Sequence, residues 1–528
     1  MYIDVVPNRA SPPAILLRES YRENGKVKKR TLANLSHLPK ALIEQIRLSL
    51  AGQLKVFEAA YSGLIFGVLF VLHALAKACG VTRALGSSRL AQLTLFLVLA
   101  RVAHQGSRLS AIRWARDHDV QGVLGLSPFD EDELYGALEW AAEHQAAIEQ
   151  RLYRDYVARS GHSPTLVLYD VTSAYLEGEH NELGAFGYNR DGKRGKQQIT
   201  RGLLTARDGE PLSVQVFEGN TSDPQTFGAQ IDTLRERFAI DEVVVVGDRG
   251  MIKARGKKQL NEVQFRYISA LTDPQIRKLI KHDVIQPDLF HEDVVEVEHG
   301  HKRLILRCDP LTQRKERHRR ADKIRALTER VAERNAFVAQ SSRAKPQAGL
   351  KALQAWIRRH KLAAFVELTL NDRTLEIHLD EAKQAEAELL DGCYCIETDV
   401  AAEHMAAKDV HDRYKDLQKV EQNFRQMKTA LLEVRPVYVR KAARTRGHVF
   451  IAMLALKITR LMEQRLKYAF GTTDTGEDAE NIASALSALS RLSLQHYHLG
   501  SEVVLGLPRP DARQAQILSA LDVQLTAP

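Results

Sequence analysis

Cysteine is scarce in this sequence, which holds four cysteines among 528 residues: Cys79, Cys308, Cys393 and Cys395. No two of them form a CxxC pair, and no cysteine and histidine residues follow the spacing of a zinc site. This scarcity argues against a disulfide framework and a structural zinc centre, and it favours a reducing compartment.

Long hydrophobic runs are also rare. The run AAYSGLIFGVLFVLHALA (59–76) is uncharged for eighteen residues, which is the lower limit of the length that crosses a bilayer. It contains a tyrosine, a serine and a histidine, so it indicates a buried core helix, as does AQLTLFLVLAR (91–101). The N-terminus MYIDVVPNRA lacks a basic region followed by an apolar one, so we expect no secretory signal and no membrane partner.

Positive charge is in modest excess, because 75 Lys and Arg residues face 66 Asp and Glu residues and give a net charge of +9. The excess is clustered in two segments. RDGKRGKQQITR (190–201) carries five cations and one acid, and RPVYVRKAARTR (435–446) carries five cations and no acid. Clusters of this kind favour a polyanionic partner, although a single basic run is more often a solvated surface.

Hydrophobic periodicity changes along the chain and predicts six regions. Strands that alternate with helices in the middle of the chain predict an α/β fold, with a mixed sheet and helices packed on it. The regions are a small β-rich lead-in with two extended runs about the turn ENGK (1–40), a helical region (41–160), the first part of the α/β domain (161–275), a separate β-plus-α insertion (276–390), the second part of the α/β domain (391–470) and a helical C-terminal region (471–528).

The α/β domain and its insertion have predictable elements. We expect strands at 166–170, 242–248, 265–271 and 391–399, a hairpin over 199–219 and a helix over 224–239. The insertion holds hairpins at 294–308 and 364–380, with long basic helices at 313–340 and 348–361 between them. Further helices are expected over 413–432 and 448–470.

Two of the expected strands end in an aspartate. LVLYD ends at Asp170, and EVVVVGD ends at Asp248. A carboxylate that follows a buried strand is costly unless it has a partner or a ligand. One such aspartate is a turn residue, whereas two of them suggest a pair that meets at one edge of the sheet.

A third carboxylate is expected on the helix RYKDLQKVEQNFRQMKTALL (413–432). At about 100° per residue, Tyr414, Leu417, Glu421, Arg425 and Lys428 share one narrow arc beside an apolar stripe. Glu421 is then able to reach the sheet, with Arg425 and Lys428 beside it to bind a phosphate. Taken alone, the same pattern also fits an ordinary amphipathic helix with an ion pair between Glu421 and Arg425.

These segments resemble the DDE transposases of bacterial insertion sequences, in the branch with the motif Y-x2-R-x3-E-x6-K. The motif aligns with Tyr414, Glu421 and Lys428, while Leu417 stands where that family has an arginine. VLYDVTS and VVVVGDRGM resemble the family's two aspartate strands, and GYNRDGKRGKQQI (187–199) and the RGH of 446–448 resemble two further blocks. The resemblance extends from the lead-in to about residue 470.

The resemblance implies an RNase H-like mixed sheet flanked by helices and interrupted by a β-rich insertion. It implies that Asp170, Asp248 and Glu421 are the catalytic residues and hold two Mg2+ ions, for which Mn2+ substitutes. The spacing of 173 residues from Asp248 to Glu421, against 78 between the aspartates, agrees with such an insertion. The residues expected to bind DNA are Tyr414, Lys428, Arg425, Arg249, Lys193, Arg194 and Lys196.

By the same resemblance, the protein binds transposon ends through region 41–160 and catalyses DNA cleavage and strand transfer. Its partners are double-stranded end and target DNA and a second copy of the chain, in a dimer to which 471–528 contributes; it is expected in the bacterial cytoplasm, at the nucleoid. Lys415, Lys419 or Arg425 replaces the motif arginine absent at Leu417. Two alternatives stay open, namely an RNase H-like nuclease without strand transfer and an inactive DNA-binding relic.

Overall fold

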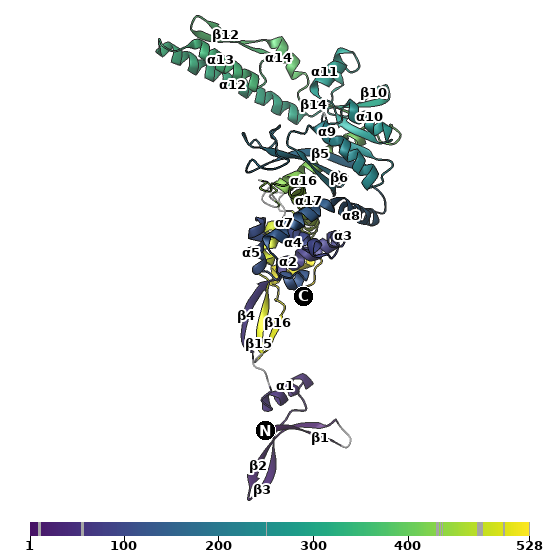
Figure 1. Cartoon of the computed structure of the whole chain (residues 1–528), viewed down its shortest axis with the longest axis vertical. Coiled ribbons are helices and arrows are strands. Elements are labelled where there is room, and N and C mark those ends of the chain that lie inside the picture. The colour runs from purple at the N-terminus through teal and green to yellow at the C-terminus, as the bar shows by residue number, and fades with distance from the viewer. Residues whose placement is uncertain are drawn as a thin grey trace. The chain divides into compact units, whose positions relative to one another are not determined.

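The computed structural model describes the chain except for residues 9–11, 54–56, 250, 429–431, 433, 436, 473–478, 500–501 and 527–528 (Figure 1). The chain divides into two compact units. One unit comprises Met1–Val71, Asp117–Val123 and Ser484–Pro528, and the other comprises Leu72–Arg116 and Leu124–Ala483. Within the described residues, no helix is both long enough and apolar enough to cross a membrane.

The first unit begins with a three-stranded antiparallel sheet. Its strands are β1 (Tyr2–Val6), β2 (Ala14–Glu23) and β3 (Lys26–Asn34), in the order β1-β2-β3, and α1 (Lys40–Leu50) follows. The turn between β2 and β3 holds Asn24 and Gly25, both with positive φ (50° and 76°), as a tight hairpin turn requires. The two extended runs expected about this turn are confirmed.

The run 59–76, which we expected to be one core helix, is instead a strand followed by a helix. β4 (Phe57–Ile65) pairs with β15 (Ser493–Leu499), and α2 (Gly67–Ala78) begins two residues later. The backbone N–H groups of Phe66 and Gly67 donate to Leu492 O at 2.9 and 3.0 Å. The strand therefore depends on a partner more than 400 residues away in the sequence, which local periodicity does not reveal.

The C-terminal region, expected to be helical, is also mixed. β15 pairs with β16 (Glu502–Gly506), and the two helices are α18 (Ile482–Leu489) and α19 (Ala512–Ala520). The sheet order is β16-β15-β4. Short apolar runs such as these fit a strand or a helix equally well until their partner strand is known.

The second unit contains a helical layer formed by α4 (Arg89–Ala103), α7 (Glu131–Glu143) and α17 (Ala442–Phe470), which pack on one another. α4 and α17 confirm the helices expected over 91–101 and 448–470. A Cβ atom at Gly447 would lie 2.0 Å from Leu138 O, so only glycine allows α17 to approach α7 so closely. This unit also contains α3 (Val81–Leu85), α5 (Arg108–Arg116) and α8 (Gln145–Ser160), whereas all but the last residue of α6 (Val120–Leu124) belongs to the first unit.

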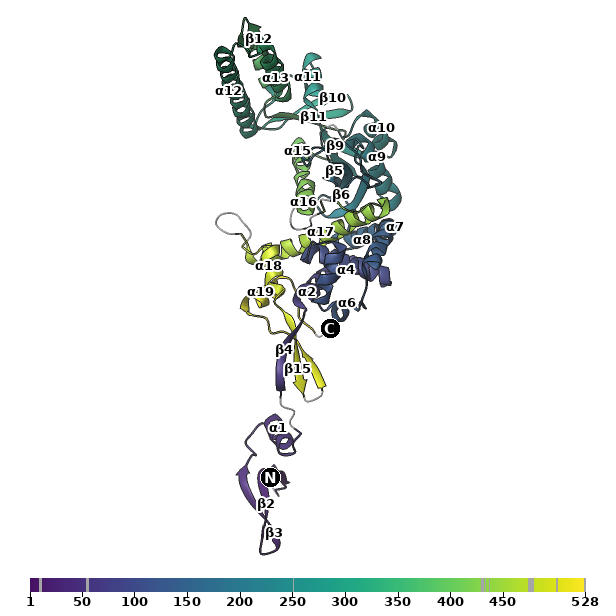
Figure 2. The ribbon, with the colours of Figure 1, turned by 60° about the vertical axis from the view of Figure 1, so that its left-hand side comes forward.

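An eight-stranded mixed sheet forms the centre of the second unit, in the order β10-β11-β14-β9-β8-β5-β6-β7. Figure 2 shows α9 and α10 on one side of β5 and α15 and α16 on the other. This arrangement confirms the predicted RNase H-like α/β fold. The strands are β5 (Leu166–Tyr175), β6 (Gln198–Ala206), β7 (Pro211–Glu218), β8 (Val244–Gly247), β9 (Arg266–Ala270), β10 (Val295–His299), β11 (Lys302–Cys308) and β14 (Cys393–Thr398).

Helices α9 (Asp223–Asp232), α10 (Ala254–Glu262) and α11 (Asp273–Lys281) connect these strands. The helix expected over 224–239 is α9, which continues as one π-helical turn over Thr233–Arg237. The aromatic side chains of Tyr169, Phe227 and Tyr267 are fully buried between the sheet and these helices. This core fixes β5 and β8 side by side.

The hairpin at 294–308, expected in the separate insertion, belongs to the main sheet. β11 pairs with both β10 and β14, so the sheet extends through the hairpin. The segment between β11 and β14 forms a body with its own apolar core, in which Leu327, Ile357 and Phe365 are buried. Its elements are α12 (Pro310–Gln340), α13 (Pro346–Arg359), β12 (Val366–Asn371), β13 (Thr374–Leu379) and α14 (Glu381–Glu388).

The helix expected over 413–432 is broken. α15 (Ala407–Lys415) ends before Asp416, and α16 (Gln418–Lys428) begins after Leu417. Asp416 accepts ion pairs from Arg413 (3.4 Å) and Lys419 (2.8 Å), which hold the junction. Leu417 is only 7% exposed, so its side chain lies in the core rather than on a polar arc with Tyr414 and Glu421.

Candidate active site at the carboxylate cavity

Asp170 and Asp248 lie next to each other at the edge where two parallel strands part. Tyr169 on β5 is the register partner of Gly247, the last residue of β8. Asp170 directly follows Tyr169, and Asp248 directly follows Gly247. Because neighbouring strands are about 4.8 Å apart, the two aspartates are neighbours across the two strands. The expectation that β5 ends at Asp170 is wrong, because β5 continues to Tyr175. The carboxylate is accessible there because β8 has ended.

The side chain of Asp170 is held against the backbone, since Val171 N donates to its Oδ1 at 2.7 Å. Burial, together with the negative charges of Asp248 and Glu421, raises the pKa of Asp170 to about 7, although the Val171 N–H and Arg190 act in the opposite direction. The three carboxylates are thus close enough to repel one another. Without a nearby cation, Asp170 is partly protonated at neutral pH.

Glu421 comes from the first turn of α16, whose other face is anchored in the core by Val420, Phe424 and Met427. Its own side chain is exposed. α16 packs beside β5 and β6 (Figure 2). This packing directs Glu421 to the same side of the sheet as the two aspartates.

One cavity of about 380 Å³ collects all three carboxylates. Cationic residues line the rest of its wall together with a fourth carboxylate. Its lining comprises Asp170, Val171, Thr172, Arg190, Asp223, Asp248, Glu421, Phe424, Arg425, Lys428 and Arg435.

The side chains that line this cavity fit a divalent cation in chemistry but not yet in spacing. Carboxylate oxygens are the ligands that Mg2+ prefers, and the volume leaves room for the waters that this ion keeps. Among the described residues, however, no three His, Cys, Asp or Glu side chains lie close enough to hold one metal ion. The three carboxylates thus line one cavity without forming a preformed metal site.

Tyr414, at the end of α15, contacts the second aspartate. Its Oη donates to Asp248 Oδ1 at 3.3 Å, and burial together with the charge of Asp248 raises the pKa of the phenol. The phenol therefore stays protonated and remains a donor that orients Asp248.

One of three cations, Lys415, Lys419 or Arg425, is expected to replace the arginine absent at Leu417. Lys415 lies over the ring of Tyr394 at 4.8 Å, and Lys419 donates to Arg207 O at 2.9 Å, so both are engaged outside the cavity. Arg425 is exposed and lines the cavity. Of the three, Arg425 is the one that the structure brings to the carboxylates.

Lys428 is held on the cavity wall by two acceptors. Its Nζ donates to Thr172 Oγ1 (2.5 Å) and to Asp191 Oδ1 (3.0 Å). Burial and the charges of Arg201 and Arg435 lower the pKa of Lys428 to about 8, although Asp191 acts to raise it. A further anion bound beside Lys428 would raise this pKa and favour the charged ammonium.

The basic run 190–201 is divided in the structure. Lys193 Nζ lies 5.7 Å from the centre of the Tyr175 ring, Lys196 pairs with Glu177 at 2.7 Å, and Arg194 is exposed. Within the described chain, none of these three cations lines the carboxylate cavity. They remain predicted DNA ligands beside it.

Arg249 is oriented away from the carboxylates, because it pairs with Asp273 at 3.0 Å. It lines a second, larger cavity of about 760 Å³ together with Tyr414, Lys415 and residues of α12. Since Tyr414 contacts Asp248, the two cavities adjoin at this tyrosine.

Several lining residues were not identified from the sequence. Arg190 donates through Nη2 to both carboxylate oxygens of Asp223 (2.6 and 2.7 Å), and Arg435 pairs with Asp191. The sequence signal for this pair is Asp191, the single acid inside the basic run RDGKRG.

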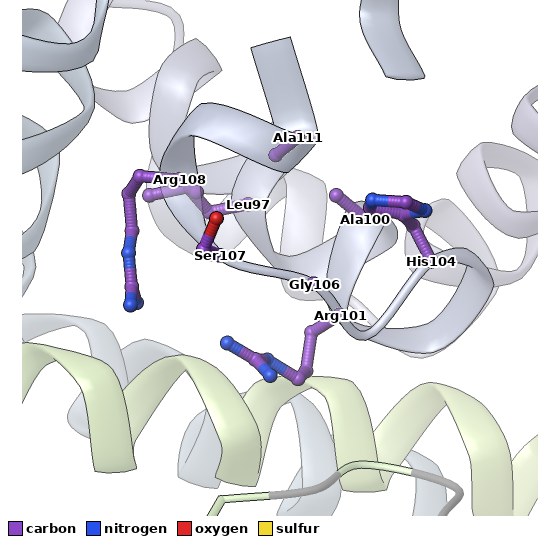
Figure 3. Close-up of a pocket in the computed structure, with 8 residues that line it drawn as sticks. All are labelled: Leu97, Ala100, Arg101, His104, Gly106, Ser107, Arg108 and Ala111. Carbon is purple, nitrogen blue, oxygen red and sulfur yellow. The ribbon is translucent and has the colours of Figure 1, made fainter. Parts of the chain in front are cut away.

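A further small pocket lies between α4 and α5, away from the carboxylates (Figure 3). Arg101 and Arg108 point to the same side of it, towards a neighbouring helix. Its volume of about 20 Å³ has room for one water molecule and excludes a nucleotide. The carboxylate cavity is thus the better candidate for an active site.

Comparison with known protein families gives two matches. Residues 161–458 match the family described as "Transposase DDE domain", and residues 3–62 match the "IS1634 family transposase, N-terminal domain". The first match includes β5, β8 and α16, and therefore all three carboxylates.

Solved structures offer a distant likeness. The piggyBac transposase, described as a synaptic complex with hairpin DNA, shares 9% identity and a TM-score of 0.35, covering 75% of this chain and 69% of that chain. A search of curated proteins found no match. Because the DDE domain match covers more than half of the chain and an IS1634-type N-terminal domain precedes it, this protein belongs to the DDE transposases of insertion sequences.

Proposed function

We propose that this transposase cuts transposon ends and joins them to target DNA with Asp170, Asp248 and Glu421 as its catalytic carboxylates. The observation that carries the proposal is the shared cavity, in which three carboxylates from β5, the end of β8 and α16 face a wall of cations. DNA suits such a cavity for two reasons. Its phosphates pair with the cations of the wall, and the bond to be cleaved is a P–O bond of one of its phosphodiester groups, which can lie beside the carboxylates.

We propose two Mg2+ ions as the cofactors, with Mn2+ able to substitute. Asp170, Asp248 and Glu421 would hold them. When bound, such ions activate a water or a 3′-hydroxyl and stabilise the departing oxygen. Burial and the negative charges of Asp248 and Glu421 raise the pKa of Asp170, and bound cations would offset both effects.

The surrounding residues orient the carboxylates and the DNA. Tyr414 fixes one oxygen of Asp248 by its hydrogen bond. Lys428 and Arg425 present cations to a phosphate in the cavity. Arg249 and the cations Lys193, Arg194 and Lys196 extend the positive surface along the DNA on either side.

Substitution of each carboxylate tests the assignment. We expect Asp170→Ala, Asp248→Ala and Glu421→Ala each to abolish Mg2+-dependent cleavage of end DNA while binding of that DNA in EDTA is retained. Asp241→Ala is the matched control, since Asp241 is an exposed carboxylate seven residues before Asp248. Cleavage retained in any of the three variants contradicts the assignment.

A pre-cut end separates the remaining alternatives. The wild-type protein is expected to join a pre-cut transposon end to a target plasmid, whereas a nuclease without strand transfer gives no joined product. An inactive relic would bind the end and give neither cleavage nor joining in Mn2+. We also propose that the ends are paired in a homodimer at the nucleoid, as light scattering with and without end DNA would test.

A further inference from the structure

Asp191 is a buried carboxylate behind the cation wall of the carboxylate cavity. Its side chain is 1% exposed. Oδ1 accepts from Lys428 Nζ at 3.0 Å and from Arg435 Nη1, and Oδ2 accepts from Tyr175 N at 3.1 Å. One carboxylate thus connects β5, α16 and the segment that follows α16.

The backbone around Asp191 is fixed from both directions. Arg190 N donates to Ser173 Oγ at 3.1 Å, and Asp191 N donates to Asn189 Oδ1 at 2.8 Å. Asp191 therefore has little freedom to turn towards solvent.

The segment that carries Arg435 is anchored to the end of β5. Val437 N donates to Tyr175 O at 3.2 Å, and Glu177 N donates to Val437 O at 3.0 Å. These bonds keep Arg435 beside Asp191, although residues 435 and 191 are far apart in the sequence.

Positive charge exceeds negative charge at this point. Besides Lys428 and Arg435, the buried Asp191 faces Arg201 on β6, which is 0% exposed. None of the three guanidinium nitrogens of Arg201 has a hydrogen-bond partner in the described chain, and the guanidinium lies 5.7 Å from the centre of the Phe424 ring. Asp223, another carboxylate that lines the cavity, is already paired with Arg190. A buried charge without a partner is costly, so a second anion beside Asp191 would be stabilising.

Donors remain for such an anion. Lys428 uses two of its three N–H groups on Thr172 and Asp191, and the bonds described for Arg435 use one of its five. Both residues line the carboxylate cavity, whereas Asp191 does not. The unused donors are therefore on the side from which substrate enters.

We propose that Arg435, oriented by Asp191, is a further phosphate ligand beside Lys428, so that the two cations form a subsite for one phosphodiester group of the DNA strand that lies in the carboxylate cavity. Arg435 is a phosphate ligand in this subsite, and Asp191 is a positioning residue. Arg201 beneath them adds positive potential without touching the DNA. The proposal rests on the function proposed above, because it assumes that DNA occupies the cavity.

Neutral phosphate substitution tests the subsite directly. A set of end-DNA duplexes carries one uncharged methylphosphonate at successive positions, and binding of the full-length protein is measured in EDTA. For the wild-type protein we expect one position near the cleavage site to weaken binding about ten-fold. In Arg435→Ala that position is expected to cost clearly less than in the wild type, because only Lys428 then binds the phosphate, while the other positions cost the same as before.

Matched variants separate a subsite from a structural role. Arg440→Ala is the control, since Arg440 is exposed in the same segment, and it is expected to show the wild-type pattern. Asp191→Asn is expected to reduce the loss of affinity that a methylphosphonate causes at the same position. The double variant Asp191→Asn/Arg435→Ala is expected to differ little from Arg435→Ala. A plot of log affinity against log salt concentration has a negative slope, and in Arg435→Ala this slope is expected to be shallower by about 0.9, which corresponds to one lost phosphate contact.

Thermal melting identifies variants that fail to fold, and Arg435→Lys provides a milder change if Arg435→Ala is unstable. The proposal is overturned if folded Arg435 variants keep the wild-type pattern of methylphosphonate effects. Failure of the proposed catalytic function is distinguished from this result, since it appears in the cleavage assays of the carboxylate variants rather than in metal-free binding.

Discussion

Replacing Asp170 by Asn should stabilise the protein in the absence of metal, because the wild-type carboxylate is held where ionisation is unfavourable. Burial and the charges of Asp248 and Glu421 raise the pKa of Asp170 from 3.8 to about 7. Below the ordinary pKa both proteins carry a neutral side chain there and should be equally stable. As pH rises towards 7, the wild type loses this stability and the variant does not.

The size of the effect follows from the pKa shift. A shift of about three pKa units corresponds to about 4 kcal/mol as an upper limit at full ionisation. Asp170 is partly exposed and lines a cavity of about 380 Å³, so screening and relaxation reduce the expected difference to roughly 1–2 kcal/mol. For the second unit, which has about 400 residues, this is a rise of roughly 1–2 °C in Tm.

The assay is thermal unfolding of Asp170→Asn and wild type in EDTA at pH 5, 6, 7 and 8. The difference in Tm should grow with pH and level off above about pH 7, and Mg2+ should stabilise the wild type more than the variant. Asp241→Asn, an exposed carboxylate, should show no such trend. A variant that is less stable than the wild type at pH 8 would refute the reasoning.

Three further changes have defined outcomes. Because the pKa of Lys428 is lowered to about 8, affinity of the wild type for end DNA should fall between pH 7 and pH 9, whereas Lys428→Arg should stay constant; parallel curves in fluorescence anisotropy would contradict this. Leu417→Arg should lower Tm and leave DNA affinity unimproved, since residue 417 is buried; a stable variant that binds more tightly would show the opposite. Cys308 and Cys393 are direct partners on β11 and β14, and their N–H groups bond elsewhere, as in a closely spaced pair. A thiol oxidant such as diamide should therefore join them, as mass spectrometry of an unreduced digest would detect, and two free thiols after oxidation would count against the register.

The two aspartates were predictable because each apolar strand and the aspartate that adjoins it form one short, local stretch of sequence. A run of β-branched residues predicts β8, and parallel neighbours bring the residues that follow them to one edge. Glu421 was predictable from its spacing in the motif, although the single helix that we expected is two helices. Asp416 lies at the break between α15 and α16, and its ion pairs with Arg413 and Lys419 stabilise the turn there. Helical periodicity in the sequence does not predict these ion pairs.

Other features depend on pairings between distant segments. β4 exists as a strand because β15 pairs with it, and the hairpin β10–β11 joins the main sheet because β14 returns to pair with β11. The role of Asp191 likewise depends on α16 and on Arg435, which is 244 residues further along the chain. Sequence patterns identify such residues as acidic or basic, but their partners appear only once the chain is folded.

The insertion leaves the sheet at the end of β11 and returns at the start of β14, two strands that are hydrogen-bonded neighbours. Topologically it is therefore the connection of a β-hairpin, however large its helices are. A connection of this kind can be lengthened, shortened or exchanged for another body while the strands that carry the carboxylates keep their order. The fold thus allows the insertion to diverge in sequence and size independently of the strands and helix that carry the three carboxylates.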